Sequence, residues 1–557
     1  MSIKHRLAIL MCSACVSAAL LPAGPAAADD AQTERLQRQI DAMQQQLLDL
    51  KRQMKQTKEA VSAAPAGAPD YTKAPITKAP WPAPGVQIKV GGFIEAAGIF
   101  SQRNLVADVG SPGFSSIPFP NSSLYHEPVA TFSARQSRIS LLATGDIDPI
   151  QHLAAYFEMD FLGAGVTANS RESNSYQPRI RQAFASYDND DAHFHVMAGQ
   201  GWSLLTQNRV GITPRMENIP LTIDAQYVVG FNWARQTEFR LVGDWNKVAW
   251  FGVSLEAPQV NFVSNGVFPF SGAAATANFG GGTLPPGITV NDLNACQAGG
   301  LLNNTTSCSI NEAPDIIEKF AFDPGWGHYE VVGIQRFFTD RVYETAIEGT
   351  GSNKTHLGWG AGGSVLLPLW PKYVDFQGSV LTGAGLGRYG SSQLPDVAFN
   401  TDGSLNPLQT TQAMIGLVAH PVTGLDVYSY AGQEQVNSAP WTIGATQGGY
   451  GNPFFVNNGC LLESQVGGSA AFNMAIAPTV CTANIQRTQE FTVGFWQDLY
   501  KGNVGRVVFG MQYEYINVKA FPGTVHPPAA DGVGTPNAGL NPNNSVFLTS
   551  LRFYPWQ

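Results

Sequence analysis

The stretch HLAAYFEMDFL, residues 152–162, alternates apolar and polar side chains along most of its length. In a β-strand successive side chains point to opposite faces, so one face of this segment would be wholly apolar. That face carries Leu153, Ala155, Phe157, Met159 and Phe161. The opposite face carries Tyr156, Glu158 and Asp160. The period of two therefore predicts an amphipathic strand.

The same period recurs from Val86 to the end of the chain, in segments of roughly 10 to 15 residues separated by turns. In 87–100 one face would carry Ile88, Val90, Ile94 and Phe100, and the other Gln87, Lys89 and Glu95. A soluble β-sandwich also buries one face of each strand, so the alternation alone leaves two architectures open. The composition, with 13% charged and 11% aromatic residues, favours strands that alternate between lipid and water.

The lengths of the connections separate the two architectures, because short turns and long excursions alternate strictly along the chain. Short connections are expected at 145–150, 188–191, 245–247, 324–327, 369–373, 420–424 and 500–503. Long ones are expected at 101–130, 163–177, 201–230, 259–313, 339–356, 387–409, 436–487 and 522–543. Outer-membrane barrels have short periplasmic turns and long external loops. The pattern predicts about 16 antiparallel strands in a transmembrane β-barrel over residues 86–557. The stretch 226–233 could add a further strand.

Residues 1–28 have the form of a cleaved export signal. Lys4 and Arg6 begin it, an apolar run follows from Leu7 to Leu21, and Ala26–Ala28 offer a small-residue cleavage site. An uncleaved membrane anchor is the alternative, but the run is short for a span that needs about 20 residues. A lipoprotein signal fits less well, because the residues before Cys12 and Cys15 do not match a lipidation site.

Residues 29–61 are predicted to form a periplasmic coiled-coil helix. Apolar residues recur there at spacings of four and three: Leu36, Ile40, Met43, Leu47, Leu50, Met54 and Val61, with only Thr57 interrupting. A single amphipathic helix packed on another surface is the alternative. Residues 62–85 are rich in Ala and Pro and are expected to form an extended linker.

The four cysteines beyond the signal fall in two of the long predicted loops. Cys296 and Cys308 share one loop, and Cys460 and Cys481 share another. Pairing within each loop predicts two disulfides, which an exported protein permits. A metal site is the alternative, but no Cys-x-x-Cys spacing supports it. The Asp188–Asp191 turn lacks the further spaced ligands of a calcium loop, and no cofactor or metal is predicted. The net charge of -9 argues against nucleic acid as a partner.

Several strings between Val86 and Arg240 resemble the DcaP-like porins. They are ARQSRISL at 134–141, AYFEMDFLG at 155–163, PRIRQAFASY at 178–187, AGQGWS at 198–203 and NWARQTEFR at 232–240. The resemblance implies a homotrimer of sixteen-stranded channels in the outer membrane of a Gram-negative bacterium, with a preference for anions such as dicarboxylates. Two features depart from the family pattern: Gln557 follows the aromatic C-terminal residues, and the cysteine-bearing loops are long.

The alternation places a set of arginines on the water-facing side of the predicted barrel wall. They are Arg138, Arg179, Arg181 and Arg240. A charged side chain that faced lipid at mid-membrane would cost about 2–4 kcal/mol, so these arginines are expected to face the lumen. Arg135 and Arg235 break the alternation and need a bulge or a place beyond the lipid, and Lys89 joins the same predicted lumen set. Acidic residues on the lumen face are Glu95, Glu158, Asp160 and Glu238, which could pair with the arginines and brace the wall.

These features favour a porin that lets small anionic, carboxylate-bearing solutes diffuse through an arginine-lined lumen. An envelope-anchoring or adhesive barrel whose lumen is closed is the main alternative. An outer-membrane enzyme would need a nucleophile beside a base, and no spacing such as Gly-x-Ser-x-Gly marks one, so we expect no enzymatic activity.

Overall fold

The computed structural model describes residues 85–105, 109, 113–163, 177–261, 288–290, 311–344, 351–444, 446–455, 457, 460–461, 483–523 and 540–556. The predicted export signal, coiled coil and nearly all of the linker lie outside the described residues.

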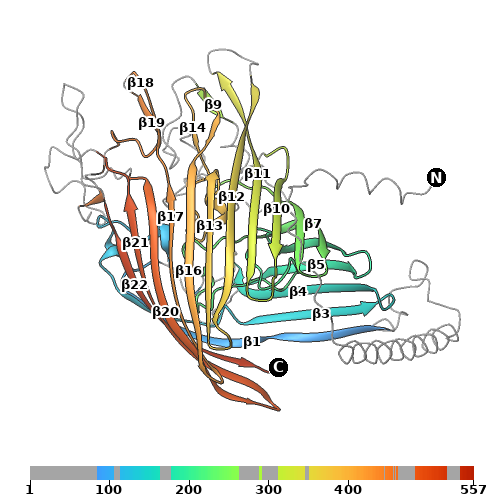
Figure 1. The fold of residues 1–557 in the computed structure, drawn as a ribbon. Helices are drawn as coiled ribbons and strands as arrows, with labels where there is room; N and C mark the ends of the chain where they lie inside the picture. Colours follow the sequence, from blue (N-terminus) through green and yellow to red (C-terminus); the bar gives the residue numbers. More distant parts are fainter. Residues whose placement is uncertain are drawn as a thin grey trace, which may run out of the picture. The chain divides into compact units, whose positions relative to one another are not determined.

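Sixteen of the described strands form one closed antiparallel barrel (Figure 1). In order around it they are β1 (Val86–Ser101), β3 (Arg138–Asp146), β4 (Gln151–Gly163), β5 (Gln177–Asn189), β6 (Phe194–Trp202), β7 (Arg235–Trp245), β8 (Ala249–Glu256), β10 (Asp315–Phe322), β11 (His328–Glu344), β12 (Ser352–Trp370), β13 (Val374–Ala384), β16 (Gln409–Val422), β17 (Leu425–Val436), β20 (Ile485–Gly502), β21 (Gly505–Ala520) and β22 (Asn543–Tyr554). The predicted strand number is confirmed.

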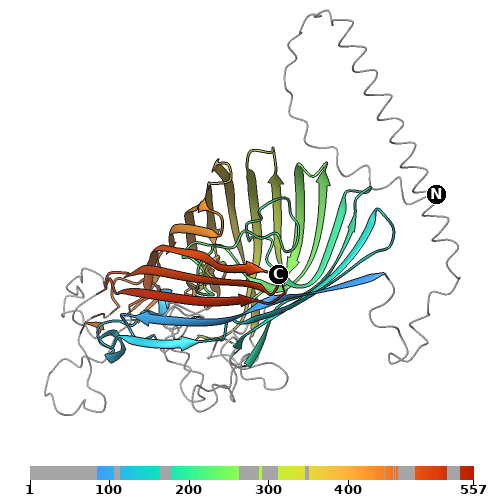
Figure 2. The ribbon, with the colours of Figure 1, turned by 90° about the horizontal axis from the view of Figure 1, so that it is seen from below.

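The barrel closes where the last strand pairs with the first. The ladder between β1 and β22 runs from Ile94 opposite Phe553 to Ser101 opposite Val546, and Figure 2 shows the two strands side by side. The other edge of β1 pairs with β3 over its first half and with β2 (Val129–Ser133) over its second half. Residues 134–137 interrupt what is otherwise one strand.

The remaining described elements are short and belong to the long connections. β9 (Ile288–Val290) pairs with β11. β14 (Val397–Phe399) pairs with β15 (Leu405–Pro407), and β18 (Ala439–Ile443) pairs with β19 (Thr446–Tyr450). Three 3-10 helices are η3 (Phe114–Ser116), η4 (Ser123–Tyr125) and η5 (Gly387–Tyr389). No helix among the described residues is both long enough and apolar enough to cross a bilayer.

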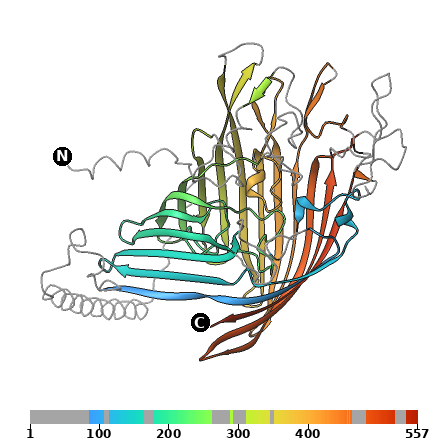
Figure 3. The same cartoon turned by 180° about the vertical axis from the view of Figure 1, so that it is seen from behind.

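All seven predicted short connections are present, and each has only two to five residues between strands. The loop predicted at 339–356 is an exception among the long ones, because β11 continues to Glu344 and β12 begins at Ser352. A strand needs about 9–11 residues to cross the hydrocarbon layer. With 17 and 19 residues, β11 and β12 extend well beyond that length, and Figure 3 shows them rising past their neighbours.

The two faces of the wall follow the predicted alternation. On β1, Ile94 is 60% exposed on the outer surface, whereas its neighbour Glu95 is 2% exposed on the inner one. On β7, Phe239 and Leu241 lie outside, and Glu238 and Arg240 are buried inside. The outer surface is therefore an apolar band suited to lipid, and the inner surface carries the polar groups.

We predict that Ile415→Arg lowers the free energy of unfolding by about 2–4 kcal/mol, because the side chain lies at the middle of β16 on the outer face and is 57% exposed there. Urea titration in lipid vesicles, followed by the heat-dependent gel mobility of folded barrels, would measure it. Ile415→Leu is the matched control. Equal stability of the two variants would contradict a lipid-facing position.

Candidate functional site

The connection between β6 and β7, residues 203–234, folds into the barrel instead of standing outside it. Its backbone is tied to the inner wall: the amides of Ile223, Val229 and Gly230 donate to Gln512 Oε1 (2.6 Å), Glu490 Oε2 (2.7 Å) and Glu434 Oε1 (2.8 Å). We call residues 203–234 the inner loop. It narrows the lumen.

The local sequence explains why residues 226–233 do not form the additional strand that the alternation allowed. Tyr227 and Gly230 have φ angles of 67° and 85°, outside the extended region. A Cβ on Gly230 would collide with the carbonyl of Ala413, so only glycine permits this close approach to β16. The apolar side chains of Ile223, Val228 and Val229 are fully buried within the barrel.

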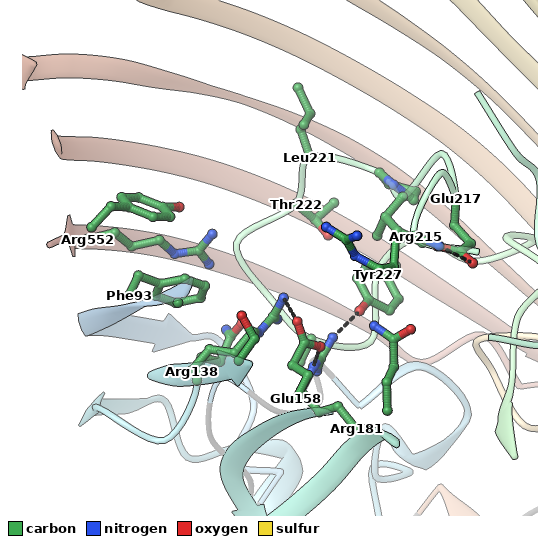
Figure 4. A pocket seen from close by; sticks show the side chains of 18 of the residues that line it. Phe93, Arg138, Glu158, Arg181, Arg215, Glu217, Leu221, Thr222, Tyr227 and Arg552 are labelled. Carbon is green, nitrogen blue, oxygen red and sulfur yellow. Dashed lines mark hydrogen bonds and ion pairs between the residues drawn. The ribbon is translucent and has the colours of Figure 1, made fainter. Parts of the chain in front are cut away.

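A cavity of about 540 Å³ lies between the inner loop and the wall (Figure 4). Its charged lining comprises six arginines, Arg138, Arg181, Arg209, Arg215, Arg506 and Arg552, against four carboxylates, Glu158, Glu217, Asp224 and Asp426. Positive charge therefore exceeds negative charge at the cavity, although the whole chain is acidic.

Aromatic rings hold two of the wall arginines in place. The Arg552 guanidinium lies between the rings of Trp496 (4.3 Å) and Phe93 (4.7 Å), and Arg138 lies 5.2 Å from the same Phe93 ring. Figure 4 shows Phe93 close to both arginines. Cation–π contacts of this kind restrict the orientation of the two guanidinium planes.

Arg181 and Arg138 both reach the cavity, as the alternation predicted for the lumen. Arg181 Nε donates to Glu158 Oε1 (2.6 Å) and Nη1 to Asp160 Oδ2 (3.0 Å), and Nη2 approaches the Tyr227 hydroxyl at 3.4 Å. Arg138 has a looser contact, with 3.7 Å between Nη1 and Glu158 Oε2, and its buried Nε has no hydrogen-bond partner. Arg138 is thus the less neutralised of the two.

Two other predicted arginines are held in bidentate ion pairs. Arg179 donates to both Asp160 oxygens, at 3.0 and 2.8 Å. Arg240 donates to Glu238 at 2.8–3.1 Å, and both residues are buried away from the cavity lining. These ion pairs join neighbouring residues of the wall. Arg179 and Arg240 therefore brace the wall, which was the alternative to a role in binding solutes.

The three remaining basic residues of the prediction lie elsewhere on the wall. Arg135 lies in the break between β2 and β3 and donates to the carbonyls of Phe161 (3.2 Å) and Gly163 (3.1 Å). Arg235 begins β7 and stacks near Trp202 and Trp233. Lys89 is exposed near the turn end of β1, on the same face as Glu95.

Four cavity arginines were not singled out from the sequence. Arg506 and Arg552 could have been found, because each alternates with outward apolar residues on β21 and β22 in the same way as Arg138 on β3. Glu95, predicted to face the lumen, accepts from Arg552 Nε at 2.8 Å. Arg209 and Arg215 lie on the inner loop, where no period marks a lumen-facing side chain.

The inner loop also carries a buried acid against the wall. Asp224 is 2% exposed, and burial raises the pKa of its carboxyl. Gln512 Nε2 donates to Asp224 Oδ2 (3.1 Å) and to Glu514 Oε1.

Among the four cysteines of the predicted disulfides, Cys460 is described: it is buried and disulfide-bonded. Cys296, Cys308 and Cys481 lie outside the described residues.

Comparison with known proteins finds a structural likeness without a sequence relative. No family model and no curated protein matches the chain. The outer membrane channel DcaP of Acinetobacter baumannii superposes with a TM-score of 0.52 at 14% identity, covering 84% of this chain and 98% of that one. The anion-selective porin from Comamonas acidovorans and Pseudomonas putida OprB each give a TM-score of 0.40 at 10% identity, covering 84% of this chain and 99% and 94% of theirs.

The fold is therefore that of a porin-like outer-membrane channel, a closed sixteen-stranded barrel with one long connection folded inside it. The likeness to the DcaP channel extends over the barrel and is a likeness of fold.

We predict that the double variant Glu434→Ala/Glu490→Ala gives a larger single-channel conductance than the original chain. It removes the acceptors of two inner-loop amides, and an unsatisfied buried amide costs about 1–3 kcal/mol, which would release that part of the loop from the wall. Planar-bilayer recordings would measure it. Gln433→Ala, a truncation on the opposite face of β17, is the control. An unchanged conductance would show that these bonds do not set the width of the lumen.

Proposed function

We propose that the chain is an outer-membrane channel for the passive diffusion of small anionic solutes, including carboxylates. The observation that carries the proposal is the excess of arginines around the cavity between the inner loop and the wall. Fixed positive charge in a narrow space with low-dielectric walls raises the local concentration of anions. A guanidinium group can also hold a carboxylate through two parallel hydrogen bonds.

The arginines that would act on a solute are those without a strong carboxylate partner. Arg209 and Arg215 are exposed, and among the described residues neither guanidinium has an ion pair. Arg215 instead lies over the Tyr156 ring at 5.0 Å. With the weakly paired Arg138, these two side chains provide positive charge on both sides of the cavity.

The paired arginines contribute differently. Arg181 is 1% exposed and shares Glu158 and Asp160 with its neighbours, so its charge is largely compensated. Its contact with the Tyr227 hydroxyl links the wall to the inner loop. We infer that Arg181 fixes the shape of the cavity, whereas Arg138, Arg209 and Arg215 set its selectivity.

The proposal extends to the parts of the chain outside the described residues. The heptads in 29–61 support a coiled coil that joins three copies in the periplasm, and the linker 62–85 would separate it from the barrel. We also propose disulfides between Cys296 and Cys308 and between Cys460 and Cys481, each closing one external loop.

We predict that Arg209→Ala/Arg215→Ala lowers the ratio of chloride to potassium permeability by about twofold or more, because two uncompensated charges leave the cavity wall. Reversal potentials across a planar bilayer in a potassium chloride gradient would measure the ratio. The control variant Lys354→Ala/Lys519→Ala removes two positive charges at the far ends of β12 and β21, outside the cavity lining. It should leave the permeability ratio unchanged.

The outcome also separates this function from an envelope-anchoring barrel with a closed lumen. Such a protein would give no regular stepwise conductance in the bilayer. Equal permeability ratios in the arginine variant and the original chain would contradict the proposed selectivity.

A further inference from the structure

At the end of the barrel where the short turns lie, histidines stand beside pairs of carboxylates. Four strands carry one each, within two residues of the strand end that meets the turn: His152 on β4, His195 on β6, His328 on β11 and His420 on β16. We call these four residues the histidine ring. The arginine-lined cavity does not include them.

The first member contacts acids from the turns on either side. His152 Nδ1 lies 2.7 Å from Asp146 Oδ1 and its Nε2 lies 3.5 Å from Asp190 Oδ2. Lys247 Nζ donates to the other Asp190 oxygen at 3.2 Å. The imidazole is about one-third exposed, so solvent in the mouth reaches it.

The second member is held between β5 and β7. His195 Nδ1 lies 2.7 Å from Asp188 Oδ1, and Nε2 lies 3.1 Å from Asp244 Oδ2. His193, in the adjacent turn, reaches the other oxygen of Asp244 at 3.2 Å. On the β8 side the neighbour is uncharged, since the Trp250 ring lies 5.5 Å from the imidazole centroid.

The third member repeats the arrangement in a more buried place. His328 Nδ1 lies 2.8 Å from Asp323 Oδ1, and Nε2 lies 3.0 Å from Glu330 Oε1. Lys319 on β10 donates to the same Glu330 oxygen at 2.9 Å.

The fourth member joins β13, β16 and β17. His420 Nδ1 lies 2.6 Å from Asp426 Oδ1, and Nε2 lies 3.5 Å from Asp375 Oδ2. On the next strands, β20 and β21, the side chains of Asp498 and Arg506 pair with each other: Arg506 Nε donates to Asp498 Oδ1 at 2.6 Å.

The geometry fixes the protonation state that suits these contacts. An ionised carboxylate only accepts hydrogen bonds, and a neutral imidazole has a single N–H. Both ring nitrogens of His195 and His328 can donate to their carboxylates only when the ring is protonated. The second contacts of His152 and His420 are ion-pair distances of 3.5 Å.

The ring faces the lumen. His152 shares the strand face of Glu158, and His328 that of Arg336, both of which point inward. Among the described residues no group of three or more His, Cys, Asp and Glu side chains is arranged to hold a metal ion.

We propose that the histidine ring is a second charge filter, at the turn end of the lumen, whose charge is set by pH. Each protonated ring member offsets part of the charge of its two carboxylates. When the histidines lose their protons, the carboxylates dominate the mouth and repel anions. Histidine is the side chain whose ordinary pKa places this change between about pH 5 and 8. The inference rests on the proposed channel function, since it requires an open lumen.

Reversal potentials of the full-length protein in planar phosphatidylcholine bilayers, in a dilute potassium chloride gradient, test the proposal at about pH 5.5 and about pH 9.5, because an imidazole between two carboxylates keeps its proton above the ordinary range. We expect the ratio of chloride to potassium permeability to fall by about threefold or more as the pH rises. The variant His152→Gln/His420→Gln, which changes the two more exposed members, should reduce this pH dependence clearly. Changing all four members to Gln should remove it. His126→Gln, at an external loop, is the control and should behave like the original chain.

The heat-dependent gel mobility of the barrel confirms that each variant is folded, and the double variant decides the test if the fourfold variant does not fold. A pH dependence that is undiminished in the folded double variant would overturn the proposal and point instead to acids of the inner loop such as Asp224. An anion preference that is the same at both pH values would also overturn it. A further outcome separates the two proposals. If the channel shows no preference for anions at either pH, but its permeability ratio still shifts with pH through the histidines, the proposed arginine selectivity is overturned and the proposed role of the histidine ring is supported.

Discussion

The structure depends on the closure of one hydrogen-bonded ladder within lipid. Each backbone amide that faces the hydrocarbon must find its partner in a neighbouring strand, because no water is available there. The pairing of β22 with β1 removes the two edges that an open sheet of sixteen strands would present. Once the sheet is closed, every second side chain points into the lumen, and the charges there have no lipid to avoid.

A closed barrel of this size would enclose a wide channel, and the inner loop makes it narrow. The loop needs partners for its backbone inside a polar lumen, and side chains of the wall supply them: the carboxylates of Glu434 and Glu490 and the side-chain carbonyl of Gln512 accept from its amides. Its apolar residues pack against Tyr428, Tyr430 and Trp496. The remaining space is bordered by arginines of the wall and of the loop itself, so the same loop that narrows the lumen also adds positive charge to it.

The alternation and the connection lengths were sufficient to predict the strand number, the two faces of the wall and the inward direction of Arg138, Arg181 and Glu158, because these follow from a period of two. The same rule applied to β21 and β22 would have found Arg506 and Arg552. The inner loop has no such period. Its path depends on contacts with residues 204 to 289 positions later in the chain, so neither the positions of Arg209 and Arg215 nor the absence of a strand at 226–233 could be inferred locally. The extra length of β11 and β12 was missed because the long connection was expected to span 339–356, whereas β11 continues to Glu344 and β12 begins at Ser352.

The distance along the chain between the inner loop and its anchors has a consequence for biogenesis. The loop belongs to the first half of the barrel, whereas β17, β20 and β21, which hold it, belong to the last hairpins to be synthesised. Until those hairpins are in place the loop lacks the acceptors of its Ile223, Val229 and Gly230 amides, and only earlier strands hold it, through contacts such as the Leu204 amide with Glu256 Oε1. Constriction of the lumen is thus a late step of assembly, completed only when the C-terminal strands join the sheet.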